Sequence, residues 1–164
     1  MNNFEVEVDG NKYWISRSVA TVVYCYTKIG GIYHVLANKR GSGVDKSGLW
    51  NCVQGFLNFD EKLEECACRE LHEETGVNIK PTDLKLYEID SNPERTNQTV
   101  LVNYFCYIRP NHVNELTTEF SEPNEVDEVK WIPIHEVKNY EWVSERHKNL
   151  IKQIWIYEIN KGEL

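Results

Sequence analysis

GFLNFDEKLEECACRELHEETGV, residues 55–77, carries the clearest structural pattern in the chain. Within it an apolar residue recurs every four positions, which is the spacing of a helix that packs one stripe against a core: Leu63, Ala67 and Leu71. Asp60 or a neighbour is the expected N-cap, and Gly76 stands where a left-handed residue would end the helix. The stretch therefore predicts a loop followed by an amphipathic helix.

Three glutamates, Glu70, Glu73 and Glu74, fall within about 100° of one another on this helix. Carboxylates so close repel each other, and near the C-terminal end they also oppose the helix dipole. A divalent cation would remove both conflicts, and hard oxygen ligands suit Mg²⁺ or Mn²⁺. For an isolated pair of glutamates, a solvated acidic helix face would be the alternative.

The same stretch fills every position of the pattern G-x5-E-x7-R-E-U-x-E-E-x-G-U, in which U is a bulky aliphatic residue. Because seven positions require one residue type, a chance match is expected in fewer than about one in ten thousand chains. This pattern is the Nudix box. The chain resembles the Nudix hydrolases, metal-dependent enzymes that cleave a diphosphate linkage attached to a nucleoside or a related group.

The resemblance implies a magnesium site, in which Mn²⁺ could substitute, made of three carboxylates and one backbone carbonyl: Glu70, Glu73, Glu74 and Gln54. Glu70 and Glu73 are also expected to be catalytic. Gln54 precedes the box glycine, where family members often carry Pro-Gly-Gly. Since any residue offers a backbone carbonyl, this difference bears on loop shape and substrate fit rather than on catalysis.

Four further box residues, Gly55, Glu61, Arg69 and Gly76, are expected from the resemblance to support the loop and helix without taking part in the chemistry. An arginine can bind a carboxylate through two parallel hydrogen bonds, which makes it a good orienting contact. A plain surface ion pair between Arg69 and Glu61 is the alternative, and it would contribute little.

Two residues outside the box complete the predicted site. Glu125, in an acidic segment ahead of Trp131, is the first candidate for the general base, and a solvated loop acid is its alternative. Arg40 could contact a substrate phosphate, or it could be an ordinary surface arginine beside a glycine turn.

The order of elements predicts an α/β fold with a mixed β-sheet between helices, which is the α/β/α sandwich that the resemblance also implies. Strands are expected at 4–8, 13–16, 18–26, 32–37, 84–89, 99–108 and 128–132, from β-branched and aromatic runs bounded by turns such as Asp9-Gly10-Asn11. A last helix is expected from a cap at Ser144 to about Asn160. Leu150, Ile151, Ile154 and Trp155 would form its apolar face.

Length and composition bound the class of protein. The 164 residues fit one domain, 1–164, and 41% hydrophobic with 27% charged residues indicate a globular protein. We expect no membrane span and no secretory signal. Five cysteines, an odd number, indicate reduced thiols and a cytoplasmic location. The net charge of −8 argues against binding of extended nucleic acid. A homodimer is compatible with these features.

The expected function is hydrolysis of a small nucleotide-type diphosphate such as a nucleotide sugar, ADP-ribose or a nucleoside triphosphate. A silent Nudix-fold module that binds a nucleotide without cleaving it is the alternative. An isoprenoid diphosphate isomerase would require its own cysteine and histidines. Pro93 lies near a position that marks ADP-ribose-cleaving members, although it also fits an ordinary turn. Four aromatic residues could stack on a base or belong to the core: Trp14, Trp50, Tyr104 and Trp142.

Overall fold

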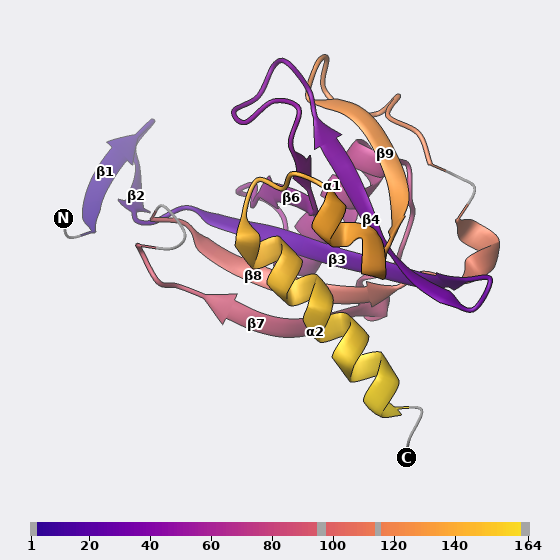
Figure 1. Ribbon diagram of the computed structural model, residues 1–164. Helices are drawn as coiled ribbons and strands as arrows, with labels where there is room; N and C mark the ends of the chain where they lie inside the picture. The colour runs from indigo at the N-terminus through magenta and orange to yellow at the C-terminus, as the bar shows by residue number, and fades with distance from the viewer. Residues whose placement is uncertain (1–2, 95–97, 114–115, 162–164) are drawn as a thin grey trace.

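A mixed seven-stranded sheet forms the centre of the computed structural model, which describes residues 3–94, 98–113 and 116–161 (Figure 1). Its strands are β3 (Val19–Ile29), β4 (Ile32–Arg40), β5 (Trp50–Asn51), β6 (Val53–Phe56), β7 (Leu84–Asp90), β8 (Val100–Tyr107) and β9 (Val126–Pro133). The main path runs β5-β4-β3-β8-β7, while β6 pairs with β3 and β9 pairs with β4. The pairing of β3 with β8 is parallel and the other pairings are antiparallel.

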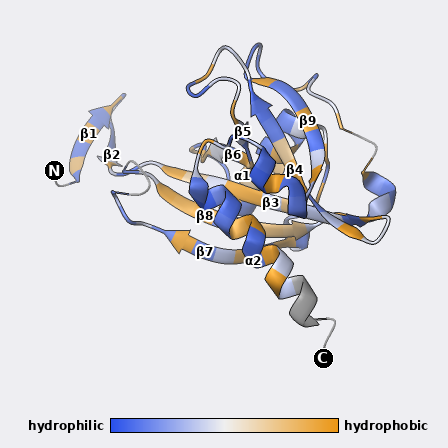
Figure 2. Cartoon of the chain, viewed as in Figure 1, coloured by the Kyte–Doolittle hydropathy of each residue, from blue (hydrophilic) through white to orange (hydrophobic). Residues whose placement is uncertain are grey.

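Two helices cover the two faces of this sheet. Helix α1 (Leu63–Thr75) packs Ala67 and Leu71 against Val23 and Cys25 of β3. Helix α2 (Glu145–Lys161) packs Leu150, Ile151 and Ile154 against the opposite side of the same strand. Because β3 is buried on both faces, its sequence is almost continuously apolar, and Figure 2 shows this in β3 and β8. The predicted α/β class with a mixed sheet between helices is confirmed.

Strands β3 and β4 pair only near the turn that joins them and then separate. Residues Tyr26–Ile29 pair with Ile32–Val35, and the first half of β3 pairs with β6. On its other side β4 pairs with β9 from His34 to Arg40, and near its end it pairs with β5. This divergence places the end of β4, β6 and the start of β9 around one end of α1. These are the elements that carry the predicted site residues.

The N-terminal strands β1 (Phe4–Val8) and β2 (Asn11–Ile15) form a separate two-stranded sheet that stands away from the rest of the molecule (Figure 1). Asp9 and Gly10, with φ angles of 51° and 79°, form the turn. Such a two-residue turn matches the twist of a hairpin. Asn11 was expected within the turn, but it belongs to β2 and pairs with Val8.

Several predicted boundaries differ from the observed ones. β3 extends to Ile29 because the hairpin to β4 is tight, and β4 extends to Arg40 because its end pairs with β5 and β9. The short strands β5 and β6 were not predicted. Three 3₁₀-helices were also missed: Pro81–Asp83, Pro110–His112 and Ile134–Asn139. Ser144 caps α2 as expected, since its Oγ accepts the Arg146 N–H at 3.1 Å. Trp155 was wrongly placed on the buried face of this helix, because it is 46% exposed.

The cysteines are all unpaired, and four of the five are buried. Among the described residues, no helix has both the length and the apolar character that crossing a membrane requires.

Candidate active site

The loop before α1 is closed by side-chain hydrogen bonds to its own backbone. Glu61 accepts the Asn58 N–H and Glu65 accepts the Lys62 N–H, both at 2.8 Å. Lys62, rather than Asp60, therefore stands at the N-cap, and the helix begins two residues later than an Asp60 cap would place it. At the other end Gly76 has the expected left-handed conformation, with a φ of 77° and its N–H bonded to the His72 carbonyl.

Arg69 connects the loop to the acidic part of the helix. Its Nε and Nη2 donate to the two carboxylate oxygens of Glu61 at 2.9 and 2.7 Å, the bidentate arrangement. Nη2 also reaches the Phe56 carbonyl at 3.1 Å, while Nη1 donates to Glu70 at 2.6 Å and Glu73 at 3.0 Å. The Arg69 hydrogen bonds lower the pKa of Glu61 to about 2. Arg69 thus lies between the loop carboxylate and two helix carboxylates.

Gly55 lies directly against the carboxyl group of Glu70. A Cβ atom at this position would overlap the Glu70 carboxyl carbon and both of its oxygens. The φ of Gly55 lies outside the left-handed region, so the glycine is required by the close approach of Glu70 and not by backbone strain. The glycine that opens the box therefore makes room for a carboxylate of the box helix.

Glu74 is buried beneath this surface and is held by two hydrogen bonds. Asn38 of β4 donates its side-chain N–H to the Glu74 carboxylate, and the backbone of Gln54 donates a second bond. Asn38 is only 2% exposed, and its Oδ1 has no hydrogen-bond partner in the described part of the chain. Asn38 was not singled out from the sequence, because a single asparagine in a strand carries no pattern.

The segment that carries Glu125 is fixed against the end of β4. The Gly41 and Gly43 N–H groups donate to the carbonyls of Glu125 and Asn124 at 2.7 and 2.8 Å. A Cβ atom at Gly41 would overlap the Asn124 carbonyl, so this glycine allows the two segments to approach. The acidic segment is therefore held in place beside α1.

These segments enclose a cleft of about 580 Å³. Seven of the predicted residues line it: Arg40, Gln54, Gly55, Arg69, Glu70, Glu73 and Glu125. Glu74 lies below, bonded to Asn38 and Gln54, and Glu61 and Gly76 act from the edges of the loop and helix. Phe56 and Asn58, which were not predicted as site residues, also line the cleft, as does Glu122, a further acid of the segment that carries Glu125.

The carboxylates of this site lie close together, and Arg69 offsets only part of the repulsion between their charges. Burial raises the pKa of Glu70, and the charges of Glu73 and Glu125 add to it, while Arg69 opposes the shift. Burial also raises the pKa of Glu74 well above its usual range, and Glu70 and Glu125 contribute to that rise. Glu125 is therefore electrostatically close to both helix carboxylates, although they are far from it in the sequence.

An oxygen-rich donor set of this kind fits a hard divalent cation such as Mg²⁺. The buried Oδ1 of Asn38, which has no hydrogen-bond partner in the described residues, adds one more oxygen acceptor beside Glu74. In the described residues, however, no three His, Cys, Asp or Glu side chains are already grouped around a common metal position. Arg69 holds Glu70 and Glu73 instead, so a bound cation would share or replace the contacts of this guanidinium group.

The four aromatic residues that could have stacked on a base lie away from the cleft. Trp50, Tyr104 and Trp142 are buried in the core, and Trp14 lies on the distant hairpin, so none of the four lines the cleft. Phe56, which is 59% exposed, is the aromatic residue of the cleft. The proposed marker Pro93 lies in the β7–β8 connection, outside the cleft lining.

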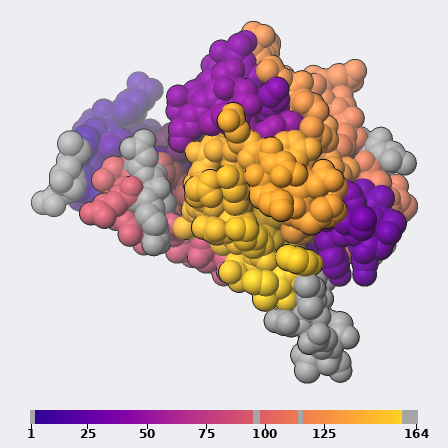
Figure 3. All heavy atoms as spheres, viewed as in Figure 1, coloured from indigo at the N-terminus to yellow at the C-terminus, as the bar shows by residue number. Residues whose placement is uncertain are grey.

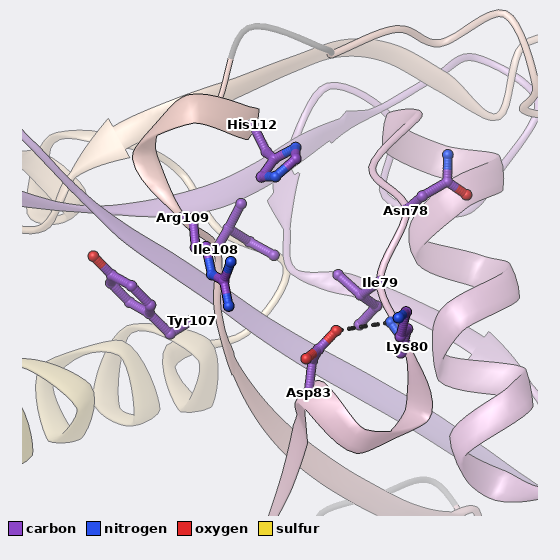
Figure 4. Close-up of a pocket in the computed structure, with 8 residues that line it drawn as sticks. All are labelled: Asn78, Ile79, Lys80, Asp83, Tyr107, Ile108, Arg109 and His112. Carbon is purple, nitrogen blue, oxygen red and sulfur yellow. Dashed lines mark hydrogen bonds between the residues drawn. The ribbon is translucent and has the colours of Figure 1, made fainter.

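A second hollow of about 340 Å³ lies beyond the C-terminal end of α1 (Figure 4). Lys80, Arg109 and His112 are among its lining residues, and Asp83 accepts the Lys80 backbone N–H at 2.9 Å. None of the predicted site residues takes part in it.

Comparison with known proteins matches residues 16–154 to the model of the NUDIX domain. NAD-capped RNA hydrolase NudC of Vibrio parahaemolyticus is 46% identical over 35 residues, which are 21% of this chain and 14% of that protein. NudC of Vibrio vulnificus is 28% identical over 86 residues, 52% of this chain and 29% of that protein. The matches thus span less than a third of these curated relatives.

Solved structures show the same fold. The NUDIX domain of Shewanella oneidensis NrtR, crystallised with ADP ribose, has a TM-score of 0.72 at 23% identity, covering 87% of this chain and 89% of that one. An Ap4A hydrolase binary complex from C. elegans has a TM-score of 0.65 at 13% identity, covering 87% and 98%.

Proposed function

The chain belongs to the Nudix family, and we propose that it is a divalent-metal-dependent hydrolase that cleaves the diphosphate linkage of a small nucleoside diphosphate derivative. The observation that carries this proposal is the convergence of Glu70, Glu73 and Glu125 on one cleft that Arg40 and Arg69 also line. Carboxylates can hold a cation, and a guanidinium group such as that of Arg40 can bind phosphate oxygens, and both features favour diphosphate hydrolysis.

The proposed metal ligands are the carboxylates of Glu70, Glu73 and Glu74, together with the Gln54 carbonyl. When bound there, Mg²⁺ would neutralise diphosphate charge and acidify water, which is worth several kcal/mol in such reactions. Arg69 and Gly55 keep the Glu70 carboxylate at the cleft wall. Asn38 and the Gln54 backbone orient Glu74 from below.

Two residues at the opposite wall complete the proposal. Glu125 is the proposed general base, because it faces the same cleft and its charge acts on both Glu70 and Glu74. It would take the proton from the attacking water. Arg40 is the proposed phosphate-binding residue. Its Nε is held by the Asp45 carbonyl at 2.6 Å, which leaves its terminal nitrogens available for an anion in the cleft.

The proposed substrates are compact diphosphates such as ADP-ribose, nucleotide sugars, dinucleotides or nucleoside triphosphates. The net charge of −8 disfavours a long polyanion. The NudC relatives are named as hydrolases of NAD-capped RNA. The chemical group shared with those substrates would be the diphosphate of a dinucleotide, so free NAD and NAD-capped RNA should be compared in one assay.

A substrate panel with Mg²⁺ tests this proposal. It compares kcat/KM for ADP-ribose, nucleotide sugars, NAD, unmodified and oxidised triphosphates, and a short NAD-capped RNA. We expect one small compound to be preferred over the RNA by at least about tenfold, since the acidic surface opposes the longer anion. A tenfold preference for RNA at physiological salt would refute the charge argument.

The panel also separates hydrolysis from silent binding. Glu73→Gln is the active-site variant, and Glu64→Gln is its matched control on the same helix, where the carboxylate bonds Tyr104 instead of the cleft. Turnover lost in the first variant and kept in the second supports the hydrolase. Tight binding without turnover of any compound by the wild type would indicate the silent module instead.

A further inference from the structure

A phenylalanine of the acidic segment, residues 116–125, stacks on helix α1. The ring centroids of Phe120 and His72 lie 4.5 Å apart, and the two ring planes meet at 29°. His72 belongs to α1 and directly precedes Glu73, one of the proposed metal ligands. This ring contact therefore joins the segment that carries Glu125 to the helix that carries the other carboxylates of the cleft.

The acidic segment is attached to the rest of the chain near both ends by backbone hydrogen bonds. Near its start, the Thr117 N–H donates to the Thr75 carbonyl of α1 at 3.0 Å. At its end, the Gly41 N–H donates to the Glu125 carbonyl at 2.7 Å. Between these points, in the described chain, every hydrogen bond of residues 118–122 has its partner within the segment. The stacked ring therefore attaches the part of the segment that these backbone bonds leave unattached.

Two tight turns connect this ring to Glu125. The ring lies within the first turn, in which the Ser121 N–H donates to the Thr118 carbonyl at 3.2 Å. In the second turn the Glu125 N–H donates to the Glu122 carbonyl at 3.1 Å. Because turns closed in this way give the backbone a short and defined path, a shift of the ring would also shift Glu122 and Glu125, which both line the cleft.

Burial in the core does not explain the position of Phe120. Its side chain is 53% exposed, and Figure 3 shows the acidic segment on the surface of the molecule, at the upper right of the view. An apolar side chain that remains half exposed gains only part of the free energy of burial. Its stacked contact with His72 is thus the specific interaction that a smaller residue would lose.

We propose that Phe120 is a positioning residue for the hydrolysis proposed above, on which this inference rests. Its ring, stacked on His72, holds the acidic segment so that the Glu125 carboxylate reaches the attacking water. Phe120 is not among the described residues that line the cleft, so it acts through Glu125 and not on the substrate. A general base must lie within hydrogen-bond reach of the proton that it takes, and a displacement of about 1 Å can lower turnover roughly a hundredfold.

Kinetic constants for the best substrate of the panel test this role. Phe120→Ala should lower kcat at least about tenfold and change KM less than about threefold, because the proposed phosphate contact of Arg40 is held separately by the Asp45 carbonyl. Phe120→Tyr keeps a stacking ring and should restore kcat to within about threefold of the wild type. Phe4→Ala is the matched control. It removes a phenylalanine of similar exposure, 48%, from the distant N-terminal hairpin and should leave kcat unchanged.

A double-mutant cycle tests whether Phe120 acts through Glu125. In the Glu125→Gln background, Phe120→Ala should lower kcat by less than about twofold more, because no base is left to misplace. The inference is overturned if the two losses multiply. It is also overturned if either single variant keeps the wild-type kcat.

Amide hydrogen exchange measures the attachment of the segment without any catalysis. In Phe120→Ala the N–H groups of Thr117 and Gly41, which bond at the two ends of the segment, should exchange at least about tenfold faster than in the wild type. His72→Ala removes the same contact from the helix side and should have the same effect, and an unchanged thermal melt of each variant excludes misfolding. Unchanged exchange in both variants would overturn the inference. A wild type that hydrolyses no compound of the panel would refute the proposed function instead, and exchange would still decide whether the ring fixes the segment.

Discussion

Replacing Gly55 by alanine should displace the Glu70 carboxylate and disable the site without preventing folding. The added methyl group would occupy the space that the Glu70 carboxyl group fills in the wild type. The Gly55 backbone does not have the left-handed conformation that excludes alanine. The expected perturbation is therefore a local collision between one methyl group and one carboxylate.

The size of the effect follows from this overlap. Restoring an ordinary van der Waals contact requires the carboxyl group to move by more than about 1 Å, and a misplacement of that size costs roughly a hundredfold in turnover. The movement also weakens the 2.6 Å contact between Glu70 and Arg69. Overpacking of this kind typically costs about 1–3 kcal/mol of stability. We therefore expect Gly55→Ala to lose roughly a hundredfold in turnover and about 1–3 kcal/mol in stability.

A double-mutant cycle separates the collision from a general effect of the methyl group. Urea unfolding gives the stability of the wild type, Gly55→Ala, Glu70→Ala and the double variant. Without the Glu70 carboxylate the methyl group has room, so Gly55→Ala should then cost less than about 0.5 kcal/mol. The reasoning is refuted if Gly55→Ala keeps turnover within about threefold of the wild type. An equal stability cost in both backgrounds would refute it as well.

Three further predictions follow from the site and the core. Glu73→Gln should lose at least about a hundredfold in turnover yet melt like the wild type, and near wild-type turnover on every cleaved substrate would contradict its role. Millimolar Mg²⁺ or Mn²⁺ should raise the melting temperature, and this rise should vanish when Glu70, Glu73 and Glu74 are all changed to Gln; titration calorimetry with a non-hydrolysable diphosphate checks the binding. Burial, with the charge of Arg146 the next cause, lowers the pKa of His147 to about 4. Since the unfolded histidine binds its proton more readily, stability should fall by about 3 kcal/mol between about pH 6.5 and 4, and His147→Gln should lack that loss in urea titrations.

The box helix was well predicted because its pattern is local. Leu71 and Ala67 are buried and Gly76 is left-handed, as the spacing and the terminal glycine indicated. The start was less accurate, since Asp60 is the better N-cap residue by type, yet the helix is capped at Lys62. The Glu65 side chain decides it by accepting the Lys62 N–H, a bond that depends on the path of the loop.

The opposite wall of the cleft depends on contacts between distant segments. Arg40 and Glu125 were named individually, but nothing in the sequence placed them together. That placement comes from the pairing of β4 with β9 and from the close approach of Gly41 to Asn124. Asn38 could not be found at all, because its importance arises only from the buried Glu74 side chain that it meets.

The ion pairs of Arg69 explain how the acidic helix can fold before a cation is bound. Three glutamates near the C-terminal end of a helix would destabilise it by mutual repulsion and by opposing its dipole. Arg69 contacts Glu70 and Glu73 directly, and Asn38 with the Gln54 backbone satisfies Glu74. The pKa values of Glu70 and Glu74 are nevertheless raised, chiefly by burial and then by the neighbouring carboxylates. Under the proposed function, a bound cation would offset the remaining repulsion among these carboxylates.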